Sequence, residues 1–195
     1  MRIFQKQYKQ LSDEELMAML SKGNQKAFDE IYHRYSDILF GYFMKMLARD
    51  KEKCEDMVHD LFAKIIRKPD YFDVNRSFRT WVFSVATNMC KNEYKRMSVR
   101  KHVSNDFEPT KSIQSSSDTL KKVHESYFSE SFYEELNALD EKHKSVFSLR
   151  HFEGLSMKEI AEALDINEGT VKSRLFYATK TLAAALKEFN PIYNQ

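Results

Sequence analysis

Polar and basic side chains gather at the start of the last predicted helix, within the stretch EGLSMKEIAEALDINEGTVKSRLFYA (153–178). The preceding helix breaks at DINEGT, and the chain restarts with Thr170, Lys172, Ser173 and Arg174 on or beside one exposed face. Arginine and lysine can bind guanine or phosphate, while serine and threonine can bond to phosphates or base edges. The pattern predicts a helix-turn-helix whose second helix enters the major groove of DNA; a helical hairpin with a solvated face is the alternative.

The turn between these two helices contains residues suited to shaping it. Ser156 and Glu159 form a capping box at the start of the first helix, and Asn167 can cap the second. Ala161 is small where the two helices cross, and Asp165 lies where the chain must turn. Because aspartate tolerates the left-handed conformation better than most residues, we expect a short turn here.

An acidic row lies on one face of an earlier helix, predicted over about 51–68. Glu52, Asp56 and Asp60 recur at intervals of four residues, with His59 beside them. Like charges at this spacing slightly destabilise an isolated helix. Such a row is suited to a basic protein partner, although a row of charges is more often a solvated face.

Aromatic side chains precede a run of cations around the next helix, predicted from about residue 78 to about 97. The aromatic residues are Tyr71, Phe72, Phe78, Trp81 and Phe83, and the cations are Lys91, Lys95, Arg96, Arg100 and Lys101. This combination suits single-stranded nucleic acid, because bases stack on rings while cations bind the backbone, and a loop could hold an unstacked base. Core packing is the alternative for Trp81 and Phe83, whereas Asn88, Lys91 and Asn92 are better candidates for an exposed contact face.

The sequence contains no grouping of residues that is typical of an enzyme active site. We find no nucleophile–base pairing, no metal-ligand spacing and no phosphate-binding glycine-rich loop. Cys54 and Cys90 form no CxxC motif, and the 6 histidines are scattered. We therefore expect no catalytic site, no metal and no cofactor.

The composition predicts the helices that must position these residues. The chain has 195 residues with only 4 glycines and 3 prolines, and helical spacing recurs throughout, which favours an all-α fold. The formal net charge is only +2, so any nucleic-acid surface must be local. Without a signal peptide or an apolar run long enough to cross a membrane, we expect a cytoplasmic protein that is not itself a membrane protein.

A polar segment divides the chain. Residues 104–118, SNDFEPTKSIQSSSD, are serine-rich and nearly free of aliphatic side chains. Such a segment buries too little apolar surface to offset its ordering entropy. We therefore predict two small helical domains, 1–100 and 128–190, joined by a flexible linker over 101–127, with a flexible arrangement of the domains.

Three segments in this order resemble the extracytoplasmic-function (ECF) subgroup, group 4, of bacterial sigma factors in the sigma-70 family. CEDMVHDLFAKII resembles region 2.2, and FRTWVFSVATNMCKNEYKR resembles regions 2.3–2.4. LDEKHKSVFSLRHFEGLSMKEIAEALDINEGTVKSRLFYATKTL resembles region 4. The likeness covers nearly the whole chain, and region 3 is replaced by the short linker, as in that subgroup.

The resemblance implies a promoter-specificity subunit without an active site of its own, which binds core RNA polymerase and promoter DNA. Region 2.2 would bind the clamp helices of the polymerase β′ subunit through Asp56, His59, Asp60 and Phe62, although His59 replaces the usual glutamine. A flipped base and the non-template strand of the −10 element would contact Phe72, Asp73, Asn75, Arg79, Asn88, Lys91, Lys95 and Arg96.

Region 4 would bind the −35 element, with the polymerase β flap as a further partner. Its contact residues would be Thr170, Lys172, Ser173, Arg174 and Tyr177, while Asp165 stands where glycine is common. The family also implies an anti-sigma factor, often anchored in the inner membrane, that covers both domains.

Rival functions explain fewer of these motifs. A response-regulator-like activator would share the helix-turn-helix but would leave region 2.2 and the segment around Trp81 unexplained. A helical hydrolase would need the catalytic groupings that the sequence lacks. A pure interaction module would leave the DNA-facing residues without a role.

Overall fold

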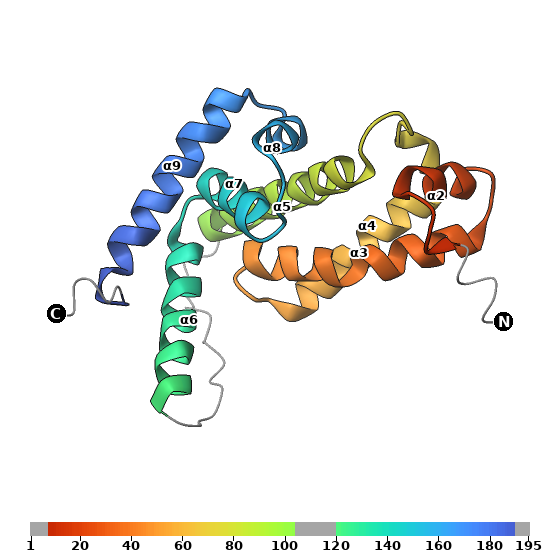
Figure 1. Ribbon diagram of the computed structural model, residues 1–195. Coiled ribbons are helices and arrows are strands. Elements are labelled where there is room, and N and C mark those ends of the chain that lie inside the picture. The colour runs from red at the N-terminus through yellow and green to blue at the C-terminus, as the bar shows by residue number, and fades with distance from the viewer. Residues whose placement is uncertain (1–7, 104–119, 190–195) are drawn as a thin grey trace.

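The computed structural model of this chain describes residues 8–103 and 120–189, and every regular element within them is a helix (Figure 1). The predicted all-α fold class is therefore confirmed. The first half contains α2 (Asp13–Leu20), α3 (Gln25–Met46), α4 (Lys51–Arg67), the 3-10 turn η1 (Pro69–Tyr71) and α5 (Phe78–Val103). The second half contains α6 (Leu120–Ala138), α7 (Glu141–His151), α8 (Met157–Leu164), α9 (Glu168–Ala185) and the 3-10 turn η2 (Lys187–Phe189).

Side-chain caps explain where six of the helices begin. The capping residues each accept a hydrogen bond from a backbone N–H of the first turn, and they are Ser12, Asn24, Asp50, Asp140, Ser156 and Asn167. Such short polar side chains stabilise a helix start because they satisfy N–H groups that have no partner within the helix. The caps predicted at Ser156 and Asn167 are thus confirmed.

The central helix of the first half is α3. It packs against α2, α4 and α5, and it buries Tyr42 and Phe43 completely. The Tyr42 hydroxyl lies 2.9 Å from Oγ1 of Thr87 in α5, so the buried phenol has a hydrogen-bond partner. Phe83 is also fully buried and Trp81 packs half-buried against the core, which confirms the core alternative for both.

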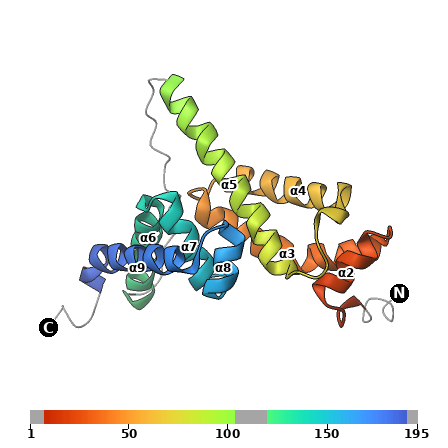
Figure 2. The ribbon, with the colours of Figure 1, turned by 90° about the horizontal axis from the view of Figure 1, so that it is seen from above.

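The two halves lie against each other. α8 packs beside α5 and α7 beside α3, as the two views in Figures 1 and 2 show. Val146 and Leu149 of α7 belong to the same buried apolar cluster as the core of the first half. A second, smaller cluster joins α6, α7 and α9. Whereas the sequence predicts a flexible arrangement of two domains, the structure places them in one packed arrangement.

The predicted linker overlaps the ends of two helices. α5 runs through residue 100 to Val103, and α6 begins at Leu120, so both enter the predicted linker 101–127. The rest of that linker, 104–119, lies outside the described residues. In the parts of the chain that the structure describes, no helix is long and apolar enough to cross a membrane, and no three ligand-type side chains gather where they could bind a metal ion.

Candidate functional site

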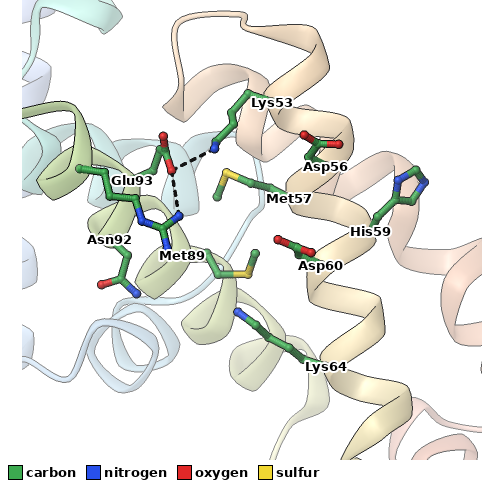
Figure 3. Close-up of a pocket in the computed structure, with 10 residues that line it drawn as sticks. Lys53, Asp56, Met57, His59, Asp60, Lys64, Met89, Asn92 and Glu93 are labelled. Carbon is green, nitrogen blue, oxygen red and sulfur yellow. Dashed lines mark ion pairs between the residues drawn. The ribbon is translucent and has the colours of Figure 1, made fainter. Parts of the chain in front are cut away.

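The fourth helix, α4, has one buried and one exposed face. Its buried face consists of Cys54, Met57, Val58, Leu61, Phe62 and Ile65, which recur at intervals of three and four. Asp56, His59 and Asp60 fall between these positions and are exposed. They line a groove of about 310 Å³ between α4 and α5 (Figure 3). The structure therefore brings together three of the four residues predicted to bind the polymerase.

Some of the charged side chains around this groove form ion pairs and others do not. Glu93 of α5 is only 6% exposed, and its Oε2 lies 3.1 Å from Nζ of Lys53 and 3.5 Å from an Nη of Arg96. Within the described residues, neither Asp56 nor Asp60 forms an ion pair. Their charges therefore face solvent, where a basic partner could reach them.

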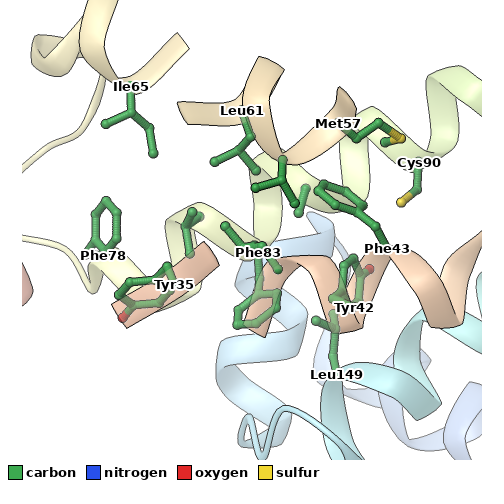
Figure 4. Close-up of a cluster of buried hydrophobic side chains, with 14 of the residues drawn as sticks. Tyr35, Tyr42, Phe43, Met57, Leu61, Ile65, Phe78, Phe83, Cys90 and Leu149 are labelled. Carbon is green, nitrogen blue, oxygen red and sulfur yellow. The ribbon is translucent and has the colours of Figure 1, made fainter. Parts of the chain in front are cut away.

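Phe62, the fourth predicted polymerase contact, is buried against α3. It is 3% exposed, and its ring centroid lies 4.6 Å from that of Tyr32 and 5.9 Å from that of Phe28. Its neighbours on α4, Leu61 and Ile65, likewise point toward the interior (Figure 4). Phe62 therefore belongs to the packing of α4 against α3 and presents little surface to a partner.

The loop between α4 and α5 is fixed at its base and exposed at its tip. Phe72 is 4% exposed, and its ring centroid lies 5.3 Å from those of Phe78 and Trp81. At the tip, Oδ1 of Asp73 accepts hydrogen bonds from the backbone N–H and the side-chain amide of Asn75, at 3.0 and 2.9 Å. These hydrogen bonds lower the pKa of the Asp73 carboxyl. The buried Phe72 ring thus fixes the base of the loop, and the polar side chains of its tip face solvent.

The remaining predicted contacts to the −10 strand come from α5. Asn88, Lys91 and Lys95 lie at helical positions three and four apart, so they share one side of the helix. Asn88 and Lys95 are exposed and Lys91 is half-buried. Arg96 is exposed beside the groove, whereas the Arg79 guanidinium donates to the backbone carbonyl of Glu153 in the second half. The structure therefore directs these cations to different neighbours.

The helix-turn-helix is formed by α8 and α9. Ser156 and Glu159 complete the predicted capping box, and Asp165 adopts the left-handed conformation with φ 53°. The backbone N–H of Ile166 donates to the carbonyl of Ala161 at 3.0 Å, which closes the turn. Ala161 is 9% exposed at the crossing. The predicted turn chemistry is confirmed in each of these respects.

The residues predicted to bind the −35 element lie on α9 and differ in how exposed they are. Lys172, Ser173 and Tyr177 are exposed, and Arg174 is half-buried. Thr170 is also half-buried, and its N–H and hydroxyl both donate to Oδ1 of Asn167, at 2.7 and 3.0 Å. The structure therefore places all five residues on the first turns of one helix.

Two exposed residues were missed by the reasoning from sequence. Phe176, beside Tyr177, is 62% exposed, and the available signal was an aromatic residue outside the apolar stripe of α9. Arg76, in the loop before α5, bonds to Glu162 of α8 at 2.5 Å. No local sequence pattern indicates the contact between Arg76 and Glu162, because the two residues are 86 positions apart.

Comparisons with known proteins match both halves of the chain. The family model for sigma-70 region 2 matches residues 31–99, and the model for sigma-70 region 4 matches residues 129–182. The ECF RNA polymerase sigma factor SigW of Bacillus subtilis is 27% identical over 176 residues, which cover 87% of this chain and 94% of the relative. The ECF RNA polymerase sigma factor SigL of Mycobacterium tuberculosis is 30% identical over 159 residues, which cover 81% and 88%.

A solved structure shares the fold. The sigma factor RpoE from Bartonella quintana, in its co-crystal structure with the anti-sigma factor NepR, aligns with a TM-score of 0.67 and 23% identity. The alignment covers 83% of this chain and 98% of that one. Two family models in the expected order and relatives matched over most of their length lead to one assignment: the chain belongs to the ECF sigma factors of the sigma-70 family.

Proposed function

We propose that this chain is a group 4 sigma factor that binds core RNA polymerase and directs promoter-specific initiation of transcription. It recognises the −35 and −10 promoter elements and stabilises the opened −10 strand. One observation carries the proposal: two surfaces suited to different forms of DNA lie on one chain beside an unpaired acidic face. The protein contributes no active site, because polymerisation belongs to the core enzyme.

In this proposal, the acidic face of α4 binds the clamp helices of the β′ subunit. Asp56, His59 and Asp60 are exposed, and the two carboxylates are free of ion pairs within the described residues. Charge complementarity would orient the encounter and exclude acidic partners. The second half would reach the β flap while α9 lies on the −35 element.

The DNA contacts divide by chemistry. On α9, Lys172 and Arg174 can bind phosphates or guanine edges in the major groove. In the first half, the polar loop tip at Asp73 and Asn75 would capture a flipped base, while Lys95 and its neighbours on α5 bind the strand that carries it. Duplex recognition and strand capture therefore belong to separate halves.

The test is transcription in vitro with purified core polymerase and genomic DNA fragments from the source organism. Core polymerase alone does not start at specific sites, so discrete start sites that depend on this protein would support the proposal. The upstream sequences of those sites would identify both promoter elements. Failure to bind core polymerase and failure to direct any start site would together refute it.

We also propose an anti-sigma partner that covers both halves. The structurally similar RpoE is bound to the anti-sigma factor NepR, and a second similar structure, CnrH, is bound to the cytosolic domain of CnrY. A partner anchored in the inner membrane would hold this protein there until a signal releases it to the nucleoid. Co-purification of the tagged protein with a membrane protein before induction, and loss of that partner afterwards, would support this arrangement.

A further inference from the structure

The start of α5 is held by a side chain from the beginning of the chain. The backbone N–H of Phe78, the first residue of α5, donates to Oε1 of Glu14 on α2 at 2.9 Å, although the two residues are 64 positions apart. A helix leaves its first N–H groups without partners of its own, and its dipole favours a carboxylate beside them. The Ser77 hydroxyl, just before α5, accepts only from the N–H of Thr80, at 3.2 Å. Glu14 therefore adds to this helix start an acceptor from another helix.

The Phe78 side chain connects this bond to the loop before α5. The side chain is fully buried, and its ring centroid lies 5.1 Å from that of Tyr35 on α3 and 5.3 Å from that of Phe72. Tyr35 and Phe78 lie beside each other in the apolar cluster (Figure 4). Phe72 forms the base of the loop whose tip carries Asp73 and Asn75. One buried residue thus links α2 and α3 to the loop that is proposed to capture a flipped base.

Polar contacts also fix α2 on α3, so the position of the Glu14 carboxylate is defined. The neighbouring Asp13 carboxylate accepts from an Nη of Arg34 at 2.7 Å, and the Tyr35 hydroxyl donates to its other oxygen. The second Nη of Arg34 donates to the carbonyl of Tyr8, before α2, at 3.0 Å. The first turn of α2 is therefore held against α3 by bonds that do not involve Glu14.

We propose that Glu14 is a positioning residue for the −10 contact: its bond to Phe78 fixes the start of α5 and, through the Phe72 ring, holds the loop in the form that accepts the opened strand. This inference rests on the proposed function. A loop that is already ordered loses less conformational freedom on binding, which raises its affinity. A change at Glu14, which has no proposed contact with DNA, should therefore weaken binding of the strand.

The first measurement is the fluorescence of Trp81 in the free, full-length protein. Trp81 is the only tryptophan in the sequence, and its ring centroid lies 5.3 Å from that of Phe72 and 5.7 Å from that of Phe78. Its quenching by acrylamide thus reports how tightly the base of the loop is packed. We expect Glu14→Ala to raise the quenching constant. Glu14→Gln should restore the wild-type value, because an amide oxygen can still accept from the N–H of Phe78.

The matched control is Ser12→Ala. This change removes the hydroxyl that accepts from the N–H of Glu15 at 3.1 Å, so it weakens the cap of α2 but leaves the acceptor for Phe78 in place. We expect Ser12→Ala to leave the quenching of Trp81 unchanged. If Glu14→Ala is too unstable to measure, Glu14→Met removes the same acceptor and keeps the length of the side chain.

The second measurement is the affinity of the protein, assembled with core polymerase, for single-stranded DNA from a mapped −10 element. We expect Glu14→Ala to weaken binding about three- to tenfold, the usual range for one lost hydrogen bond, while Glu14→Gln and Ser12→Ala bind like the wild type. Removal of a negative charge would by itself strengthen binding to a polyanion, so the direction of the change separates positioning from electrostatics. Equal or tighter binding by Glu14→Ala would overturn the inference.

The two proposals fail in different ways. If core polymerase with the wild-type protein produces no specific start site, the proposed function fails, whatever the quenching of Trp81. If start sites appear but Glu14→Ala keeps the wild-type quenching and strand affinity, only the positioning role fails. It fails as well if Glu14→Ala and Ser12→Ala weaken strand binding equally, because Glu14 then contributes only to the stability of α2.

Discussion

The two surfaces proposed to bind DNA differ in how far they are built into the structure. On α9, Lys172 and Tyr177 project from a helix whose packing depends on other residues. In the loop before α5, Phe72 is part of the core, and Arg79 bonds to the other half of the molecule. The first surface can therefore change with little effect on the fold, whereas changes in the second also alter the core and the contact between the halves.

The largest effect that we expect is on stability, and it tests the difference between the loop before α5 and the surface of α9. Phe72→Ala removes a buried ring that packs against those of Phe78 and Trp81, so the free energy of unfolding should fall by about 3–5 kcal/mol. Tyr177→Ala, which removes an exposed aromatic ring from α9, should change it by less than about 0.5 kcal/mol. Urea denaturation of both variants measures the two values. Similar losses would erase the distinction between the surfaces.

The acidic face of α4 should behave like α9, because its charges are exposed and unpaired. We expect Asp56→Ala combined with Asp60→Ala to weaken binding to core polymerase by about 2–5 kcal/mol while leaving stability nearly unchanged. The matched control is Asp29→Ala with Asp37→Ala, which removes two exposed carboxylates from α3. Competition for core polymerase measures the affinities. If the α4 variant competes for core polymerase as well as the wild type does, the acidic row is only a solvated face.

A single side chain on α9 should have a smaller effect. Arg174→Ala should weaken binding to a −35 duplex by about 1–3 kcal/mol, the usual value of a good arginine contact. Lys187→Ala removes a cation from η2, beyond the other end of α9, and reports the general electrostatic contribution. Fluorescence anisotropy at fixed salt compares the two. An unchanged affinity for Arg174→Ala would remove this residue from the contact surface.

The smallest effect concerns the contact between the halves. Burial lowers the pKa of Lys144 from 10.5 to about 8. Between those values the unfolded chain keeps a proton that the folded chain has released, so the folded state gains stability as the pH rises. Relative to Lys144→Met, the wild type should gain about 1 kcal/mol in the free energy of unfolding from pH 7 to pH 9. A difference that does not change with pH would show that Lys144 keeps its ordinary pKa.

Local chemistry made the helix-turn-helix predictable from sequence. Ser156 and Asn167 are caps because a short polar side chain precedes an amphipathic run, and Asp165 is one of the few residue types that accept a positive φ. The exposed face of α4 followed from the same helical periodicity that buries Leu61. In each case the determining residues lie within one or two turns of each other.

Contacts between distant residues were not predictable in this way. Phe62 was assigned to a contact surface through the resemblance, yet it is buried against Tyr32 of α3, a ring 30 positions away that the region 2.2 motif does not contain. The bond between Lys45 and Glu153 joins residues 108 positions apart. Periodicity describes which face of a helix is apolar, but it does not say which other helix covers that face.

If α9 binds the major groove as proposed, the cap at its start has a consequence for base selection. The Thr170 hydroxyl donates its only proton to Asn167, and the Ser173 hydroxyl donates its own to the carbonyl of Thr170. While these bonds persist, both oxygens can only accept hydrogen bonds. They are therefore complementary to amino groups in the major groove, N4 of cytosine or N6 of adenine, and not to phosphate oxygens. In the proposed complex, a cap that stabilises the helix would thereby limit which bases the start of α9 can favour.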